Sequence, residues 1–524
     1  MNISSSRRGF LKGLAGAASF AIGGCKCPFG SQKIKLAAVG VMGKGFSDWT
    51  PMLKTGLVEM VAFCDCDVTM REKAQMRLAQ AGIDFDMYSV PFYTDYRKLL
   101  DDAGILGIEA MTISTPDHVH APVAIQAMKL GIDVYVQKPL VRTLWELDYF
   151  EKTAKEYGRI VQMGNQGSSL DSMRRCTEVI QSGILGDVKE VHVWTNRAVW
   201  PQGQAVADWV KGHPEGDKVR AGLNWDAWLA TAKKRPFLDQ YPQDAAVYDP
   251  WKLGKNVYHT FTWRGFFDFG CGAFGDMACH TMNLPFRGLE LAGVSDAECI
   301  QIEEKNDVSY PTKSIVKLTY KARDSKARPG VRLPAVTLFW YDGFDPANPG
   351  KSGNKPKADL MPKVVKTFGA VPNTGCYIIG SKGAVLMQDD YGAKCAIALN
   401  DDKDFVDIFK HEAAKAVARV IPFCAAASSA GDGKSSVEMK GFAEGHYSEF
   451  LHAIRGEGNW YEQTHSRCFS DIEYCIPQME GILVGCIAQQ VPGKLVWNAA
   501  AQSFAGNAAA NDLVKPYIRK GWEF

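Results

Sequence analysis

The sequence lacks an excess of charge of either sign, because 60 lysines and arginines are matched by 58 acidic residues. A formal net charge of +2 at pH 7 gives no electrostatic basis for binding nucleic acid or a strongly acidic partner. Beyond the N-terminal segment, no stretch reaches the roughly 18 apolar residues that a membrane-spanning helix needs. Composition therefore excludes a nucleic-acid-binding protein and a multi-span membrane protein.

The sequence also lacks the spacing of a disulfide framework, although it contains 14 cysteines. Cys64 and Cys66 could be two metal ligands, but no second Cys or His pair follows nearby. A strand end with small apolar residues is the better interpretation. No internal repeat is present, and no metal site is predicted.

The N-terminus carries the features of an export signal. Residues 6–12 read Ser-Arg-Arg-Gly-Phe-Leu-Lys and precede a short apolar stretch, as in a twin-arginine leader. The run Ile22-Gly-Gly-Cys25 is similar to a lipoprotein cleavage site. We expect residues 1–32 to be a signal and linker and the protein to be periplasmic. Lipidation of Cys25 and an uncleaved leader are both left open.

From residue 33 onward, strand and helix patterns alternate. Apolar runs predict strands at 34–39, 58–63, 108–113, 134–137 and 160–163, and helical spacing predicts helices at 70–81, 122–130 and 144–157. Repeated βα units of this length imply a doubly wound parallel sheet over residues 33–165.

The pattern changes after residue 165. Residues 188–194, 314–320 and 335–340 alternate polar with apolar side chains, which is typical of half-exposed antiparallel strands. Residues 343–375 and 422–445 are rich in turn-forming residues and predict long loops. We therefore predict a second, α+β domain over residues 166–524, with a large open, mainly antiparallel sheet.

The turn Gly40-Val-Met-Gly-Lys-Gly45 lies between a strand and a helix, which is the context of a dinucleotide-binding turn. Glycines let the backbone approach a pyrophosphate, and the helix N-terminus supplies oriented N–H groups. Met42 replaces the middle glycine of G-x-G-x-x-G and Gly43 follows it, so the motif is imperfect. Asp65, at the end of the second strand, would accept from ribose hydroxyls and favours NAD over NADP. Its alternative role is a helix N-cap.

Two further segments follow predicted strands, at the sheet edge where ligands bind. In the first segment, the candidate contacts of a nicotinamide ribose are Ser114, Thr115, Pro116, His118 and His120. The histidines could equally be packing residues. In the second, Lys138 lies between Gln137 and Pro139 and could instead be a solvated lysine that closes a strand.

A third candidate segment combines a glycine-rich loop with a helix over residues 270–280. Asp276 and His280 are four residues apart and share one helix face. An acid and a base so placed could act on one substrate hydroxyl. A capping Asp with a core His is the alternative, and a metal pair is less favoured because no third ligand is evident.

With these motifs, the chain resembles the Gfo/Idh/MocA oxidoreductases over nearly all of residues 33–524. The resemblance rests on the glycine turn, residues 115–120, Gln137-Lys-Pro139 and the helix with Asp276 and His280. Most members carry glutamate in place of Gln137. The Gln-Lys-Pro variant is similar to an exported twin-arginine subgroup that also shows runs like residues 193–197, 200–203 and 263–268.

The resemblance implies a Rossmann domain that binds NAD and a cis peptide bond before Pro139. It implies that Lys138 and His280 act at the reacting carbinol, leaving open which is the general base, while Asp276 binds or polarises the substrate. Loss of the glutamate should leave the Lys138 amine less strongly held in its protonated form. Further cofactor contacts would be Gly45, Gln137, Lys138 and Asn165, and sugar-side residues would be Arg197, Trp200, Tyr258, His259, Arg264 and Asp276.

The expected function is NAD-dependent oxidation of a carbinol in a sugar, glycoside or cyclitol. Because an exported protein has no recycling NAD pool, we expect a tightly bound cofactor that is returned to its starting state. One alternative is a glycosidase or lyase that acts by transient oxidation; members of that glycosidase branch replace the lysine, so Lys138 favours dehydrogenase chemistry. A sugar-binding lipoprotein with an inactive cofactor site is the alternative of another class. Homodimers or homotetramers are expected.

Overall fold

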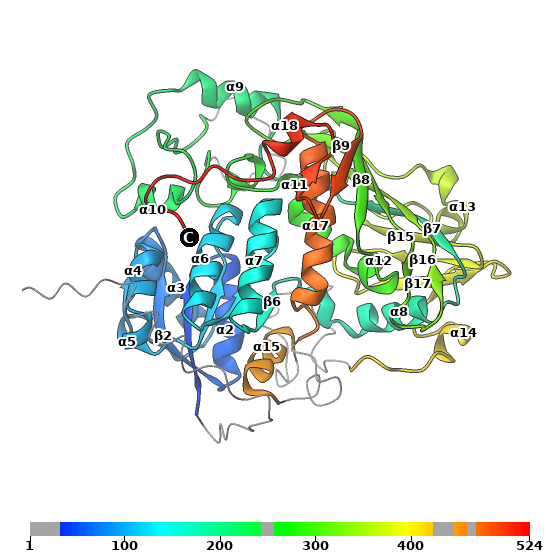
Figure 1. Ribbon diagram of the computed structural model, residues 1–524, viewed down its shortest axis with the longest axis horizontal. Helices are drawn as coiled ribbons and strands as arrows, with labels where there is room; N and C mark the ends of the chain where they lie inside the picture. Colours follow the sequence, from blue (N-terminus) through cyan, green and yellow to red (C-terminus); the bar gives the residue numbers. More distant parts are fainter. Residues whose placement is uncertain (1–31, 243–255, 423–444, 458–467) are drawn as a thin grey trace, which may run out of the picture. The chain divides into compact units, whose positions relative to one another are not determined.

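A computed structural model describes residues 32–242, 256–422, 445–457 and 468–524 (Figure 1). The leader and Cys25 lie outside the described residues. Residues 34–524 form one compact unit that contains two large sheets and two two-stranded ones among its described residues. The described cysteines are free thiols, and most of them are buried. No helix among the described residues is long and apolar enough to cross a membrane.

The first sheet is parallel and six-stranded, in the order β3-β2-β1-β4-β5-β6. Its strands are β1 (Ile34–Val39), β2 (Val58–Cys64), β3 (Phe92–Tyr93), β4 (Ala110–Ile113), β5 (Asp133–Val136) and β6 (Val161–Met163). The helices that connect or cover them are α2 (Lys44–Lys54), α3 (Thr69–Gln80), α4 (Tyr96–Asp101), α5 (Ala103–Leu106), α6 (Asp117–Lys129) and α7 (Leu144–Glu156). Because helices flank the sheet, β4 and β5 are buried along their whole length.

The register of the first sheet aligns the ends of its strands. Val39 pairs with Cys64 on one side and with Ile113 on the other, and Ile113 pairs with Val136. The residues that follow β1, β2, β4 and β5 therefore meet at one edge. The chain order reverses between β1 and β4, and such a switch point is where open α/β sheets bind ligands.

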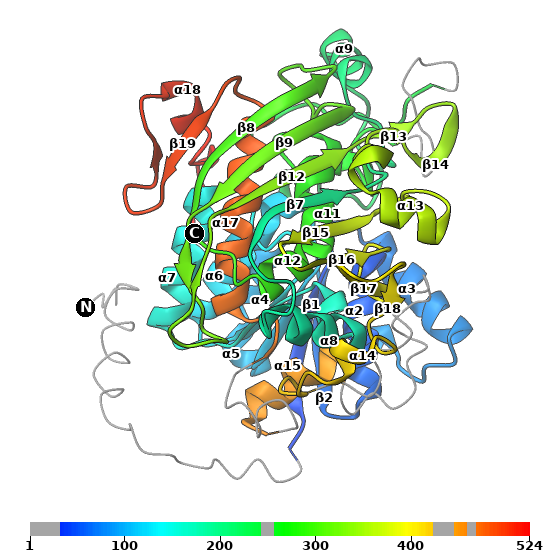
Figure 2. The ribbon, with the colours of Figure 1, turned by 90° about the vertical axis from the view of Figure 1, so that its right-hand side faces the viewer.

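The second sheet has ten strands in the order β18-β17-β16-β15-β7-β12-β9-β8-β19-β20 (Figure 2). They are β7 (Val188–Trp194), β8 (Val294–Glu303), β9 (Lys313–Tyr320), β12 (Val336–Asp342), β15 (Gly375–Gly380), β16 (Gly383–Met387), β17 (Cys395–Leu399), β18 (Val406–Asp407), β19 (Leu495–Asn498) and β20 (Ser503–Phe504). Only the β7–β12 pair is parallel among these described strands. This mixed, mainly antiparallel sheet beside a parallel one confirms the predicted fold class.

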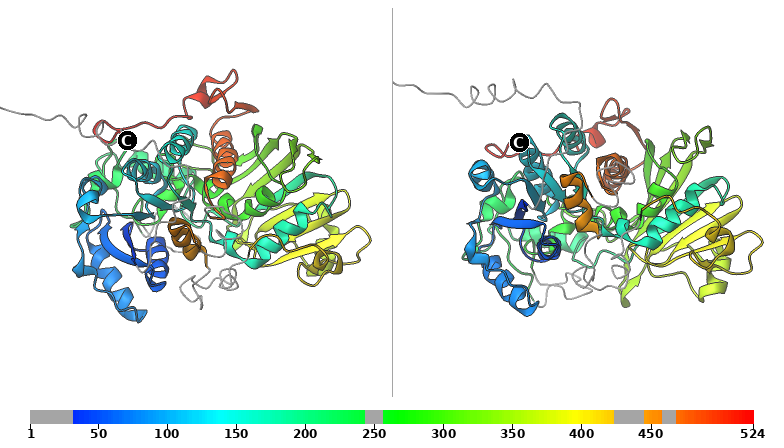
Figure 3. Two further views of the ribbon diagram at one scale, coloured as in Figure 1. Left: turned by 60° about the horizontal axis from the view of Figure 1, so that its bottom comes forward. Right: turned by 90° about the horizontal axis from the view of Figure 1, so that it is seen from below.

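Helices cover one face of the second sheet and join it to the first. They are α8 (Asp171–Gln181), α11 (Gly272–Thr281), α12 (Asn283–Gly288) and α17 (Ile472–Ala488). Helix α17 contacts α7 and β6 of the first sheet layer and also α11, β8 and β9. In Figure 3 it is the orange helix between the cyan helices and the green strands. One hydrophobic cluster runs continuously through these elements. This packing holds α11 against the ligand-binding edge of the first sheet.

The largest difference between a predicted helix start and the structure is in α6. Helix α6 begins at Asp117 rather than at residue 122, so Pro122 lies inside it. The His118 carbonyl, which Pro122 deprives of its helical donor, accepts a hydrogen bond from the Thr231 hydroxyl at 3.5 Å. A hydrogen bond from a distant segment thus replaces the one that Pro122 cannot donate. The proline, which normally marks a helix start, can therefore lie inside this helix.

The prediction of a loop over residues 343–375 was wrong in part. This segment contains the hairpin strands β13 (Phe344–Asp345) and β14 (Asn348–Ser352) and helix α13 (Pro362–Phe368). Helix α13 starts with a proline in its first turn and ends at Gly369 in the left-handed conformation. The proline and glycine that suggested a loop therefore mark the start and the end of a short helix. Residues 423–444 of the other predicted loop lie outside the described residues.

Candidate functional site

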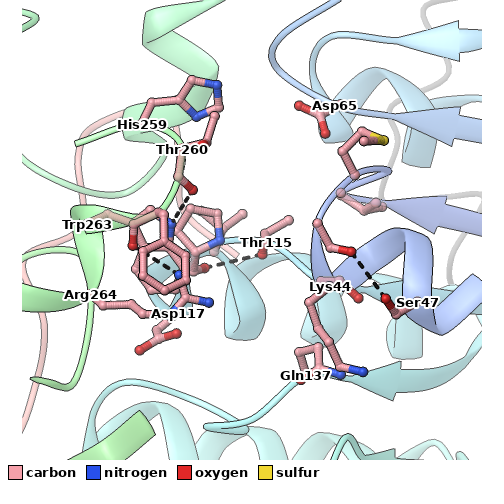
Figure 4. A pocket seen from close by; sticks show the side chains of 18 of the residues that line it. Lys44, Ser47, Asp65, Thr115, Asp117, Gln137, His259, Thr260, Trp263 and Arg264 are labelled. Atoms are coloured by element: carbon pink, nitrogen blue, oxygen red, sulfur yellow. Dashed lines mark hydrogen bonds between the residues drawn. The ribbon is translucent and has the colours of Figure 1, made fainter. Parts of the chain in front are cut away.

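A cavity of about 920 Å³ lies at the aligned strand ends of the first sheet and extends to α11. Many predicted site residues line it: Gly40, Met42, Gly43, Asp65, Ser114, Thr115, Pro116, Gln137, Lys138, Arg197, Trp200, His259, Arg264, Asp276 and His280. Gly45, His118, His120, Asn165 and Tyr258 are not among the lining residues. The structure therefore brings most of the predicted site together from segments far apart in the chain (Figure 4).

The glycine turn is shaped by close backbone contacts. A Cβ on Gly40, whose φ is +82°, would lie 2.4 Å from the Ser114 carbonyl oxygen, and one on Gly45 would lie 2.0 Å from the Gly40 oxygen. A Cβ on Gly43 would meet nothing within 4 Å. Glycine at positions 40 and 45 therefore allows the close backbone contacts of the turn. At position 43 the space beside the backbone is open.

Asp65 is not the N-cap of α3, which is Val68. Its carboxylate accepts hydrogen bonds from the N–H groups of Val41 and Asp67, each at 3.1 Å. Burial raises the pKa of Asp65. The side chain thus ties the glycine turn to the end of β2 while it lines the cavity.

The histidines of the segment after β4 are packing residues. Nε2 of His118 lies 3.1 Å from the Trp228 carbonyl oxygen, and burial lowers the pKa of His118 to about 3. His120 contacts the carbonyl oxygens of Pro139 and Thr115 at 2.7 and 2.9 Å, and burial lowers its pKa to about 4. Neither histidine is among the residues that line the cavity, so their role as cofactor contacts stays a prediction.

Lys138 is held at the end of β5 by an ion pair. Its Nζ lies 2.8 Å from Oδ1 of Asp276 and 3.1 Å from the Asp276 carbonyl oxygen. The peptide bond between Lys138 and Pro139 is cis, as the resemblance implied. Nε of Arg264 contacts the same Asp276 oxygen at 3.2 Å. Although burial opposes ionisation, Lys138 and Arg264 hold the pKa of Asp276 well below its usual range.

His280 occupies the same face of α11 as Asp276, and only 4% of its surface is exposed. Burial, assisted by the nearby Lys138 charge, lowers the pKa of His280 well below its usual value. Its Nδ1 is buried and has no hydrogen-bond partner in the described part of the chain. The Tyr391 ring lies 4.7 Å away, centroid to centroid. The site therefore presents a neutral imidazole beside a lysine cation.

Asp48 organises the site but was missed by sequence reasoning. This fully buried carboxylate accepts hydrogen bonds from Ser114 Oγ at 2.8 Å, Gln137 Nε2 at 2.8 Å and Tyr447 Oη at 3.0 Å. It also pairs with Lys44 at 3.0 Å. The spacing of Lys44 and Asp48 is that of an ordinary surface ion pair, and nothing local points to Tyr447.

The Asp48 contacts explain the glutamine in the Gln-Lys-Pro motif. A glutamate at position 137 would place a second carboxylate against buried Asp48, whereas the Gln137 amide donates to it. The carboxylate that contacts Lys138 is that of Asp276.

Asp117 is a second residue that sequence reasoning did not single out. It lies in the first turn of α6, lines the cavity and is 3% exposed. Burial raises the pKa of Asp117 to about 7. A carboxyl group of this kind can hold a proton near neutral pH and could exchange it with a ligand.

Residues 222–224 and 256–264 are joined to the segment that follows β2, and we call these two segments the roof. The Val68 N–H donates to the Gly222 carbonyl at 3.0 Å, and the Asn224 N–H donates to the Cys66 carbonyl at 2.7 Å. Nε2 of His259 lies 3.1 Å from Oδ2 of Asp67. His259, Thr260, Phe261, Trp263 and Arg264 of the roof line the cavity, on which Asp65 also lies.

Two residues of the roof, Tyr258 and His259, were predicted on the sugar side and lie elsewhere in the structure. His259 lies at the Asp65 end of the cavity through its pair with Asp67. Tyr258 is 1% exposed and packs among aromatic rings that include Phe266 and Phe269. Neither side chain is placed beside Lys138 and Asp276, because the roof segment folds toward β2.

The cavity fits a dinucleotide. Its volume is that of a cofactor site, and the glycine turn leaves backbone accessible at the N-terminus of α2.

Residues 34–165 match the model of the GFO_IDH_MocA family, described as an oxidoreductase family with an NAD-binding Rossmann fold. A glycosyl hydrolase family 109 protein of Akkermansia muciniphila is 30% identical over 175 residues, which are 32% of this chain and 34% of that protein. Inositol 2-dehydrogenase of Salmonella paratyphi B is 30% identical over 136 residues, 26% of this chain and 37% of that enzyme. The match spans about a third of each relative.

Solved structures share the fold over most of the chain. An inositol dehydrogenase homolog of Azotobacter vinelandii in complex with NAD⁺ has a TM-score of 0.54 at 15% identity, covering 89% of this chain and 98% of that one. The WlbA dehydrogenase of Chromobacterium violaceum, in complex with NADH and UDP-GlcNAcA, has a TM-score of 0.54 at 13% identity, covering 90% and 98%. Residues 34–165 are therefore similar to the NAD-binding Rossmann fold of the Gfo/Idh/MocA oxidoreductase family, and the solved structures extend the likeness of fold over most of the chain.

Proposed function

We propose that the protein is an NAD-dependent oxidoreductase that acts on a CH–OH group of a sugar, glycoside or cyclitol. The observation that carries this proposal is the placement of neutral His280 beside the Lys138–Asp276 ion pair, at the strand ends where NAD would lie. Bound NAD would supply the hydride acceptor.

His280 and Lys138 have different tasks in this proposal. Oxidation of a carbinol requires removal of its hydroxyl proton, and a neutral imidazole can accept that proton. His280 is such a group, because it lines the cavity and burial lowers the pKa of its imidazole well below the usual value. Lys138, ion-paired with Asp276, would donate to the same hydroxyl oxygen and stabilise negative charge there. We therefore assign His280 as the base.

The residues that would hold NAD are the glycine turn, Asp65 and the polar groups after β4 and β6. The N-terminus of α2 suits the pyrophosphate, and Asp65 suits the adenosine ribose and disfavours a 2′-phosphate, so NAD is preferred over NADP. Ser114, Thr115 and Asn165 are at the strand ends assigned to the nicotinamide half.

The proposal includes a cofactor that stays bound. The roof covers the cavity beside Asp65 through backbone hydrogen bonds and the Asp67–His259 pair. Retention agrees with export of a folded, loaded protein to the periplasm, with or without a lipid anchor at Cys25. The net reaction would then return the hydride to a second sugar or to the same substrate. A homodimer or homotetramer is part of the same proposal.

Heating the purified protein is expected to release about one NAD per chain into the supernatant. Release would follow from unfolding, because the roof hinders dissociation from the folded state. Enzymatic cycling or mass spectrometry of the supernatant measures the amount. An empty supernatant, from protein produced in cells that contain NAD, would count against a retained cofactor.

The variant Asp67→Ala tests whether the Asp67–His259 pair slows dissociation of NAD. Loss of the pair with His259 should speed NAD dissociation about tenfold, because truncating a buried pair acts mainly on dissociation rates. Asp307→Ala, which removes an exposed partner of Lys211, is the matched control. Equal dissociation rates in both variants would show that the pair does not retain the cofactor.

A second function is favoured by Asp117. Once a carbinol is oxidised, a neighbouring C–H becomes acidic. A base takes that proton, a C=C bond forms, and the C–O bond to the substituent beyond it breaks as the leaving oxygen takes a proton from an acid. A carboxyl with a pKa of about 7 in the cavity is a suitable proton donor. Transient oxidation followed by glycoside cleavage is therefore the second candidate. Cleavage in D₂O with deuterium gained at carbon distinguishes it from simple oxidation.

A further inference from the structure

The substrate end of the cavity contains more positive than negative charge. Lys138 and Arg264 contact the same oxygen of Asp276, at 2.8 and 3.2 Å, so two cations share one carboxylate. The neighbouring Arg197 has its own carboxylate, Asp390, at 3.5 Å and does not offset the surplus. One positive charge therefore remains without a full counter-charge beside the proposed reaction centre.

The other titratable groups here do not remove the surplus. Burial raises the pKa of Asp117 to about 7, so this carboxyl is only partly ionised at neutral pH. His280 is neutral. Because the cavity is partly shielded from water, an uncompensated charge interacts more strongly with a ligand than it would at the surface.

Arg264 is positioned as a binding group. The rings of Phe261 and Trp263 each lie 4.3 Å from its guanidinium carbon. Its Nη1 donates to the Phe261 carbonyl at 3.0 Å, and its Nε contacts Asp276. No described residue accepts a hydrogen bond from Nη2. Figure 4 shows the Arg264 side chain in the pocket beside Asp117 and Trp263. Its position is therefore set before a ligand binds, which lowers the entropic cost of binding.

We infer that the substrate carries a carboxylate near the carbinol that is oxidised, as a uronic acid or its glycoside does, and that Arg264 binds it. This assignment rests on the proposed function, because it is defined relative to the carbinol that His280 deprotonates. Arginine suits a carboxylate through its planar fork of donors. A neutral sugar would leave the surplus charge uncompensated.

The test compares methyl glycosides with the matching methyl uronides in the gluco, galacto and manno series. Binding is measured by saturation-transfer NMR titration, and reduction of the bound cofactor by its absorbance. Uronides should bind about tenfold more tightly than the neutral sugars, as expected for a charge-assisted hydrogen bond. Arg264→Leu should abolish this ratio, and Arg264→Lys, which keeps the charge, should retain part of it. Arg332→Leu, which removes an exposed partner of Asp324, should retain it fully.

The outcomes separate this inference from the proposed function. Equal binding of uronides and neutral sugars, or a preference that survives in Arg264→Leu, overturns the inference; cofactor reduction by any of these sugars would still support the function. If no sugar reduces the cofactor but Arg264-dependent uronide binding persists, the function fails and the charge preference stands. Thermal melts of both Arg264 variants show whether a loss of binding reflects unfolding.

Discussion

Lys138→Ala is expected to lower turnover by about 1,000-fold or more while NAD remains bound. The variant removes the cation that would stabilise charge on the substrate oxygen, and it leaves Arg264 as the remaining partner of Asp276. The glycine turn and Asp65, assigned to the distal half of the cofactor, are untouched. Turnover should therefore fall without loss of cofactor.

This prediction is checked by two measurements on the same preparation. Single-turnover absorbance reports reduction of the bound cofactor, and heat release reports NAD content per chain. Lys152→Ala is the control, because Lys152 forms an exposed ion pair with Asp148 on α7. Near-normal turnover in Lys138→Ala would refute the role of Lys138, and loss of NAD would reassign it to cofactor binding.

Asp48→Ala is expected to lower the free energy of unfolding by about 3 kcal/mol. The Asp48 side chain is fully buried, and its removal takes the acceptor from the Ser114 hydroxyl, the Gln137 amide and the Tyr447 hydroxyl. It also removes the carboxylate partner of Lys44. Lys44 is partly exposed and can be hydrated in the variant. We therefore expect a loss of unfolding free energy at the lower end of the range for broken buried ion pairs. NAD binding should weaken as well, because Lys44, Ser114 and Gln137 line the cavity.

Urea unfolding of the NAD-free protein isolates the stability effect from the linked loss of ligand. The matched control is Asp148→Ala, which removes a partly exposed carboxylate paired with Lys152 and should cost about 0.5 kcal/mol or less. If Asp48→Ala is no less stable than this control, the Asp48 contacts do not hold the site together.

Local sequence patterns determined much of the fold and the cofactor edge. Apolar runs predicted β1, β2 and β5 to within about two residues, because strands that are buried on both faces are apolar along most of their length. The glycine turn was recognisable because two of its positions allow no Cβ. Asp276 and His280 were expected on one face because an α-helix repeats every 3.6 residues.

Side-chain partners that come from distant segments could not be obtained in this way. Asp48 and Tyr447 are 399 residues apart, and only packing of the chain against α2 brings them into contact. His259 was expected beside the sugar, yet the roof places it against Asp67. Helix α6 includes Pro122, and the buried His118 carbonyl that loses its helical donor accepts from Thr231; no local rule anticipates that contact.

The sequence by itself determined the fold class, the glycine turn and the presence of Lys138, Asp276 and His280 at the strand ends and on one helix, since these depend on local periodicity. Only the tertiary structure decided that Asp276 pairs with both Lys138 and Arg264, and that His280 is neutral. The physical reason is that ion pairing and desolvation depend on distances and burial, which are set when α11 packs against the end of β5.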